Sequence, residues 1–122
     1  MSASGEVDHI VAKVVQQNIE TVWLVKIRGG SYFFPLVTAS GCALGALVAA
    51  YCSVTDPFNA VVSAHAHFAV AGRKAHLQVD APADFQREFV NQLYKVTEQD
   101  FDQYLQWSIE KLCERNLSVD VI

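Results

Sequence analysis

Residues 37–54 read VTASGCALGALVAAYCSV and include the most informative segment of the sequence. Small residues and hydroxyls come first, and a long apolar run follows from Cys42 onward. The run is shorter than the roughly 20 residues that span a bilayer, so we predict a buried helix. Gly41, Gly45 and Ala49 recur at intervals of four, which gives one side of this helix a smooth surface. Because the other sides are apolar as well, we expect the helix to be central.

The residues before this helix are predicted to form strands. Val7 to Val15 and Thr21 to Ile27 are rich in valine, isoleucine and tryptophan, and the polar residues 16–18 separate them. Such runs, broken by a turn-like segment, are typical of strands. Ser31 to Val37 would be a further short extended segment, which Pro35 confines to a sheet edge or an irregular path.

Two helices are predicted next. Asp56 can accept hydrogen bonds from backbone amides as an N-cap, and Pro57 fits the first helical position. This helix would run to about Gln78. Ala81-Pro82 opens the following helix, whose apolar stripe consists of Phe85, Phe89 and Leu93.

A fourth amphipathic helix is predicted to begin at a capping box formed by Thr97 and Asp100. Its apolar stripe would hold Phe101, Leu105, Ile109 and Leu112. We therefore expect one α/β domain over residues 1–122, with a few strands followed by about four helices. Complete α/β domains usually alternate strands and helices, so this order favours the C-terminal end of a larger α/β fold.

Composition excludes several classes of protein. The 122 residues are 52% hydrophobic and 18% charged, which indicates a folded chain rather than a disordered one. The net charge of -4 argues against nucleic acid as a main partner. Three cysteines without a CxxC pair, and a start without a basic and apolar leader, favour a reduced protein. We expect a soluble cytoplasmic protein that does not associate with membranes.

The beginning of the apolar helix is the main candidate site. Backbone N–H groups at a helix N-terminus are free to bind an anion, and the helix dipole attracts negative charge there. Small residues such as Ala39, Ser40 and Gly41 let an anion approach the backbone. Cys42 would stand at the edge of this anion hole as a nucleophile or base. The alternative is a tight turn into a close-packed helix, with Cys42 as a small buried hydrophobic residue.

Four blocks of the sequence resemble hydroxyethylthiazole kinases, the thiamin-salvage branch of the ribokinase-like fold. Residues 37–54 are similar to the signature VTGTGCxLSALVAAF, and residues 4–10 (SGEVDHI) are similar to TGExDxV. Residues 66–75 (AHFAVAGRKA) resemble a helix with the pattern F-x-x-AGExA, and residues 85–94 resemble the following F…FLDALY helix. Related kinases usually carry aspartate where Cys42 stands. The resemblance covers nearly the whole chain but only the C-terminal half of a family member.

The resemblance implies ATP-dependent phosphorylation of the primary hydroxyl of 4-methyl-5-(2-hydroxyethyl)thiazole, with Mg²⁺. Cys42 would be the catalytic base, and Ser40 and Gly41 would bind the transferring phosphoryl group. Ala39 would contact the substrate. Family members are trimers with the thiazole bound between subunits, so the resemblance also implies a homo-oligomer.

The resemblance further places Ser4 and Gly5 at the phosphates of ATP. Some positions depart from the family pattern. Ala39 and Ser40 replace a glycine and a threonine, and residues 80–85 (DAPADF) replace a GPGSF segment. The N-terminal half that would carry the remaining thiazole, ATP and Mg²⁺ contacts has no counterpart in the chain.

Two alternatives to a kinase stay open at this stage. In the first, the chain is a catalytically inactive remnant that binds an anion or a nucleotide, or that forms oligomers. In the second, the chain is a different enzyme with Cys42 as its nucleophile. Such a cysteine requires a histidine partner, and the candidates are His9, His65 and His67.

No metal site is expected from the histidines. His65 and His67 are two positions apart, so they diverge by about 200° on a helix and cannot share a metal. Glu6 and Asp8 either contact Mg²⁺ through water or form an ordinary solvated pair.

Overall fold

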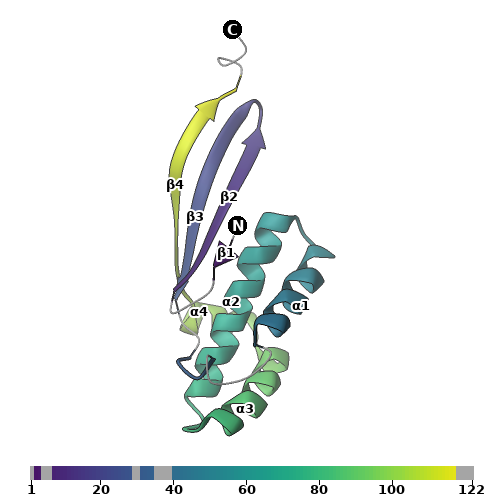
Figure 1. Ribbon diagram of the computed structural model, residues 1–122, viewed down its shortest axis with the longest axis vertical. Coiled ribbons are helices and arrows are strands. Elements are labelled where there is room, and N and C mark those ends of the chain that lie inside the picture. The colour runs from purple at the N-terminus through teal and green to yellow at the C-terminus, as the bar shows by residue number, and fades with distance from the viewer. Residues whose placement is uncertain (1, 4–6, 29–30, 35–39, 118–122) are drawn as a thin grey trace.

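The computed structural model describes residues 2–3, 7–28, 31–34 and 40–117. It contains an antiparallel sheet with strand order β1-β2-β3-β4 and a group of helices at one end of the long strands (Figure 1). The opposite end of the sheet projects beyond the helices. The elements in chain order are β1 (Ser2–Ala3), β2 (Val7–Gln16), β3 (Ile19–Arg28), α1 (Ser40–Cys52), α2 (Pro57–His76), α3 (Pro82–Lys95), α4 (Glu98–Tyr104) and β4 (Gln106–Asn116).

The strands β2 and β3 form a hairpin; the sequence predicted both strands and the turn-like break between them. Their register runs from Val7 opposite Arg28 to Gln16 opposite Ile19. The two residues between the strands, Gln17 and Asn18, both have positive φ, at 51° and 63°. Two-residue turns with this backbone match the right-handed twist of the flanking strands. Both strands are slightly longer than the predicted ranges.

One hydrophobic cluster joins the sheet to α2. Ile10, Val25 and Ile27 are 1–2% exposed and face the alanines of the helix. Ala66 and Ala69 are the buried residues on the helix side of this cluster. Small side chains let α2 approach the sheet closely, and α2 also contacts α1, α3 and α4. Helix α2 is therefore the central element of the fold.

A second cluster is aromatic and lies among the helices. Phe85 of α3 is fully buried, and its ring centroid is 5.5 Å from that of Phe33 and 5.8 Å from that of Phe89. Phe34 stacks on Phe68 of α2 at 4.8 Å. The predicted stripe of α3 is thus confirmed as part of the core.

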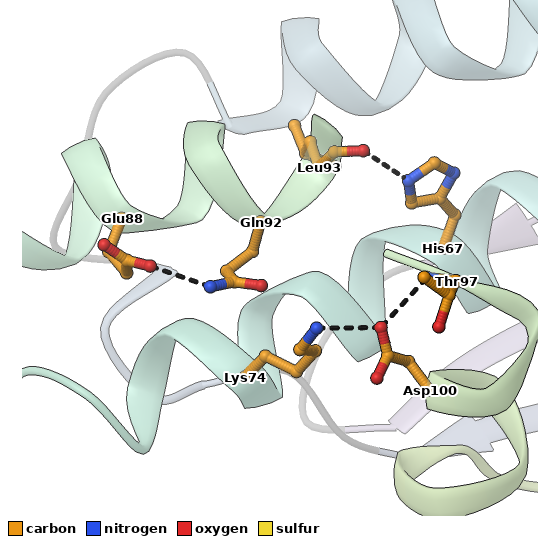
Figure 2. Close-up of polar contacts among 7 residues, drawn as sticks. All are labelled: His67, Lys74, Glu88, Gln92, Leu93, Thr97 and Asp100. Carbon is orange, nitrogen blue, oxygen red and sulfur yellow. Dashed lines mark hydrogen bonds and ion pairs between the residues drawn. The ribbon is translucent and has the colours of Figure 1, made fainter. Parts of the chain in front are cut away.

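The predicted helix starts of α2, α3 and α4 are confirmed. Asp56 caps α2 by accepting from the backbone N–H of Asn59 at 3.1 Å, and Pro82 is the first residue of α3. Thr97 and Asp100 form the capping box of α4 (Figure 2). Asp100 also accepts a 2.7 Å hydrogen bond from Lys74 of α2. The Lys74 ammonium group lowers the pKa of Asp100 below its ordinary value of 3.8.

The prediction that the fourth helix continues to Leu112 is wrong. Helix α4 ends at Tyr104, and residues from Gln106 onward form β4. The beginning of this segment also fits the alternation of a strand, because Trp107 and Ile109 alternate with the polar residues Ser108 and Glu110. Pairing along the whole edge of β3 supplies backbone hydrogen bonds to this segment and thereby outweighs its helical periodicity.

The prediction of an extended segment at Ser31 to Val37 is also wrong for residues 31–34, which the structure describes. Residues 31–34 form a turn rather than a strand, and residues 35–37 lie outside the described residues. The Ser31 hydroxyl accepts from the Phe33 N–H at 3.0 Å and lies 2.7 Å from His76 Nδ1 at the end of α2. The bond between Ser31 and Phe33 is local and competes with strand pairing.

Helix α1 is not central, contrary to the sequence prediction. Leu44 and Leu47 pack toward the aromatic cluster, while Ala46 and Ala49 are exposed to solvent. A Cβ atom at Gly45 would meet nothing within 4 Å. At Gly45 and Ala49, the smooth stripe of this helix therefore faces away from the described core.

Candidate functional site

The structure places three of the six predicted site residues at the start of α1. Ser40 is the first residue of the helix, and Gly41 and Cys42 follow it in the first turn. The other three, Ser4, Gly5 and Ala39, lie outside the described residues.

The start of α1 is a helix N-terminus without acidic side chains. Its first turn carries no acidic residue that would compete for the backbone N–H groups. The first N–H groups of a helix have no partner within it, and the dipole places about half a positive charge there. Gly41 has no side chain to block approach to these donors. The arrangement can hold an anionic group against the backbone.

Cys42 is exposed, so it is not the small buried hydrophobic residue of the alternative interpretation. Its thiol lies in the first turn of α1. An exposed thiol at this position is accessible to a substrate bound in front of the helix.

The structure gives no histidine partner to Cys42 within the described part of the chain. Both ring nitrogens of His67 are engaged, because Nε2 donates to the Leu93 carbonyl at 2.8 Å and Nδ1 lies 2.9 Å from the Tyr51 hydroxyl. His65 is 2% exposed and its Nδ1 bonds the Asp8 carboxylate at 2.9 Å. A cysteine–histidine nucleophile pair is therefore not formed by these two histidines.

A chain of hydrogen bonds holds α1 to the other helices. Figure 2 shows the His67 ring of α2 bonded to the Leu93 carbonyl of α3. Since a carbonyl oxygen only accepts, Nε2 carries the proton, and Nδ1 accepts from the hydroxyl of Tyr51 on α1. Sequence reasoning assigned no role to Tyr51. Its separation from His67 along the chain left no local signal for this contact.

Removing the Tyr51 hydroxyl should lower the stability of the protein, because the hydrogen bond to His67 is lost. Burial raises the pKa of Tyr51 above its ordinary value of 10.0. The folded state therefore holds the phenolic proton more tightly than the unfolded state, and stability decreases as the pH rises above 10. We expect Tyr51→Phe to lower the free energy of unfolding by about 1 kcal/mol near neutral pH. The difference should narrow above pH 10, as measured by urea denaturation across pH.

The control for this measurement is Tyr94→Phe, because the Tyr94 side chain is 91% exposed. It should leave the stability curve within a few tenths of a kcal/mol of the unsubstituted protein. If Tyr51→Phe and the unsubstituted protein lose stability equally above pH 10, the loss does not come from the Tyr51 hydroxyl.

An apolar hollow of about 310 Å³ lies at the other end of α1 from the candidate site. Tyr51, Val62 and Trp107 are among its lining residues, and Ser40, Gly41 and Cys42 are not. The hollow is therefore separate from the candidate site at the start of the helix.

The described residues do not form a protein cage for Mg²⁺. They contain no group of three histidine, cysteine, aspartate or glutamate side chains placed to hold a metal ion. Asp8 is engaged with His65, and Glu6 lies outside the described residues. Within the described chain, no helix has both the length and the hydropathy of a membrane-spanning segment.

Comparison with known proteins gives a consistent result. Residues 1–99 match the hydroxyethylthiazole kinase family. The hydroxyethylthiazole kinase of Acinetobacter baylyi is 38% identical over 104 residues, which is 85% of this chain and 36% of the relative. The hydroxyethylthiazole kinase of Rhodococcus erythropolis is 39% identical over 97 residues, which is 79% of this chain and 34% of the relative. The chain thus spans about a third of the length of these relatives.

A solved structure agrees with the sequence matches. The hydroxyethylthiazole kinase protein from Pyrococcus horikoshii OT3 superposes with a TM-score of 0.70 at 25% identity. The superposition covers 82% of this chain and 41% of that protein. The predicted α/β fold, equivalent to part of a ribokinase-like kinase, is confirmed, with β4 as an addition that the sequence prediction lacked. The chain belongs to the hydroxyethylthiazole kinase family.

Proposed function

We propose that this chain carries the phosphoryl-acceptor end of a hydroxyethylthiazole kinase, which transfers phosphate from ATP to the hydroxyl of 4-methyl-5-(2-hydroxyethyl)thiazole. The observation that carries the proposal is the exposed Cys42 in the first turn of α1, in a chain that belongs to this family. Thiamin salvage is the metabolic role that fits such a reaction.

The N-terminus of α1 would stabilise the transferring group. As the substrate hydroxyl oxygen bonds to the γ-phosphorus and the bond to ADP breaks, negative charge spreads over the phosphoryl oxygens. The N–H groups of Ser40 and Gly41 would donate to these oxygens, and such electrostatic stabilisation is a main source of rate in phosphoryl transfer. The Cys42 thiolate would accept the hydroxyl proton. Ala39 would contact the thiazole.

Ser4 and Gly5 would bind the phosphates of ATP, with the Ser4 hydroxyl as donor and the absence of a side chain at Gly5 allowing close approach. Mg²⁺ would arrive with the nucleotide, because Mg²⁺ is commonly held by phosphates and only one or two carboxylates. A homo-oligomer, as the resemblance implied, is part of the same proposal.

The test is a phosphotransfer assay with Mg-ATP and the thiazole alcohol. It uses the 122-residue chain alone, and the same chain joined to the part of the Acinetobacter baylyi relative that it does not match. We expect transfer in at least one form, and we expect Cys42→Ala to lower kcat by at least about tenfold, within the usual contribution of a general base. Cys52→Ala is the matched control, because Cys52 is also exposed on α1. Equal activity of the two variants would contradict the role of Cys42.

An inactive remnant that binds a nucleotide or another anion is the second candidate function. It is favoured by the coverage of about a third of each relative, since residues outside that third would also be needed for turnover. Absence of transfer from both folded forms, together with ATP binding in isothermal titration calorimetry, would replace the kinase by this function.

A further inference from the structure

Strand β4 forms an edge of the sheet. It pairs with β3 along its whole length, and none of the other strands that the structure describes lies on its opposite side (Figure 1). Such an edge offers a row of backbone N–H and C=O groups to a further strand. Trp107, Ile109 and Leu112 of β4 are also 55%, 46% and 50% exposed. The strand lies beyond residues 1–99, the part of the chain that matches the family.

The charges of β4 are balanced and ordered. Two acidic and two basic side chains follow one another as Glu110, Lys111, Glu114 and Arg115. Charged side chains on an edge usually discourage strand addition. This order has a different property, because the same four residues read in the opposite direction place a basic residue across from each acidic one. The edge is therefore complementary in charge to an antiparallel copy of itself.

A β-bulge restricts the registers that such a pairing can use. Lys111 pairs with Trp23 and Cys113 with Val22, so Leu112 is an extra residue on β4. The bulge shifts the alternation of faces, and Lys111 and Glu114 therefore share one face of the sheet, where their side chains form an ion pair at 2.7 Å. In a two-fold symmetric antiparallel pair, residues directly opposite each other must lie on the same face.

Two registers centred on the bulge meet this condition. In the first, Leu112 lies opposite Cys113 of the second copy, so Lys111 faces Glu114 and Glu110 faces Arg115. Symmetry repeats each of these contacts, which gives pairs of opposite charge and none of like charge. In the second register, Leu112 lies opposite Lys111, and every charged residue faces an uncharged one. Because opposite charges across a strand pair are stabilising, the first register is favoured.

We propose that β4 is the interface for a second copy of this chain, which adds its own β4 antiparallel across a two-fold axis, with Leu112 opposite Cys113. One sheet then continues through both copies, and the backbone groups of each edge find partners in the other. The ion pair within each chain is compatible with this contact, because a carboxylate accepts several hydrogen bonds. The interface lies outside the candidate site, so the inference does not rest on the proposed function.

Two charge reversals, Lys111→Glu and Glu114→Lys, test the register. Either variant alone places like charges opposite each other twice, so sedimentation velocity should give self-association at least tenfold weaker than for the unsubstituted chain. An equal mixture of the two variants restores opposite charges at both contacts. We therefore expect the mixture to form a heterodimer with an affinity within threefold of that of the unsubstituted dimer.

The mixture separates the interface from other effects of charge. Both variants lose the ion pair within the chain, so recovery on mixing cannot come from that bond. Both also stay net negative, because each substitution changes the net charge of -4 by two, so general attraction cannot explain recovery. Lys95→Glu is the matched control, since Lys95 is exposed on α3, and its self-association should be unchanged.

Cys113 gives a second measurement, because the proposed register places the two copies of this exposed residue beside the axis. Strand spacing and rise put their Cα atoms about 6 Å apart. This separation lies inside the range of roughly 4.4–6.8 Å that disulfides allow. Oxidation with copper phenanthroline should therefore give a cross-linked dimer on a non-reducing gel. The cross-link should disappear in Cys113→Ala and persist in Cys52→Ala.

Several outcomes would overturn the proposal. The unsubstituted chain would have to stay monomeric across a hundredfold range of concentration, or assemble equally well with Lys111→Glu. Failure of the mixed variants to associate would exclude the register, as would a dimer that cross-links through Cys42 or Cys52 but not through Cys113.

Discussion

Replacing Phe85 by alanine should lower the free energy of unfolding by about 3–5 kcal/mol, the range measured for large-to-small changes at buried aromatic positions. The Phe85 side chain is fully buried. Its ring contacts those of Phe33, Phe34 and Phe89, with centroid distances of 5.2–5.8 Å. Alanine would leave a cavity in the centre of this cluster, where α2 and α3 meet. Urea denaturation followed by circular dichroism would measure the loss.

Tyr94→Ala is the matched control, since it removes a ring of similar size from the same helix. The Tyr94 side chain is 91% exposed, so its removal should change the free energy of unfolding by less than about 0.5 kcal/mol. Equal losses for the two variants would mean that Phe85 is not packed as described. If Phe85→Ala does not fold, Phe85→Leu should still fold, with a smaller loss.

Asp8→Ala should destabilise the protein by about 2 kcal/mol, because it leaves a buried donor without its partner. His65 is 2% exposed, and its Nδ1 donates to the Asp8 carboxylate across 2.9 Å. This bond ties the beginning of β2 to the middle of α2. Chemical denaturation at constant pH would measure the effect.

Asp8→Asn should recover part of that loss, because the amide oxygen can still accept from Nδ1. Asp102→Ala is the control for removal of an aspartate, since Asp102 is exposed on α4, and it should be nearly neutral. Identical losses in Asp8→Ala and Asp8→Asn would show that the hydrogen bond to His65 carries little of the stability.

Local features of the sequence correctly predicted the starts of α2, α3 and α4 and the two strands of the hairpin. Asp56, Pro82 and the Thr97–Asp100 pair act through bonds or ring geometry within one turn of the chain, so their residue types alone are informative. The position of the candidate site at the start of α1 depended on the same kind of local signal. The sequence also pointed to Cys42, whose exposure in the structure suits the proposed role.

The errors arose where distant segments decide the outcome. Ile109 and Leu112 fit the periodicity of a helix, but pairing with the edge of β3 makes their segment a strand. The composition of α1 predicted burial, whereas the described residues cover only one side of it. The Tyr51–His67 bond and the Asp8–His65 bond join residues that no sequence spacing connects.

The pairing of β4 with β3 has a consequence for folding during synthesis. Strand β3 pairs with β2 on one side and with β4 on the other. It is complete at Arg28, but β4 begins only at Gln106. While a ribosome makes the helices between them, this edge of β3 has no strand beside it. Such edges invite pairing with other chains, and contacts between residues so far apart in sequence form slowly. The nascent chain is therefore most prone to aggregate in the interval between these two strands.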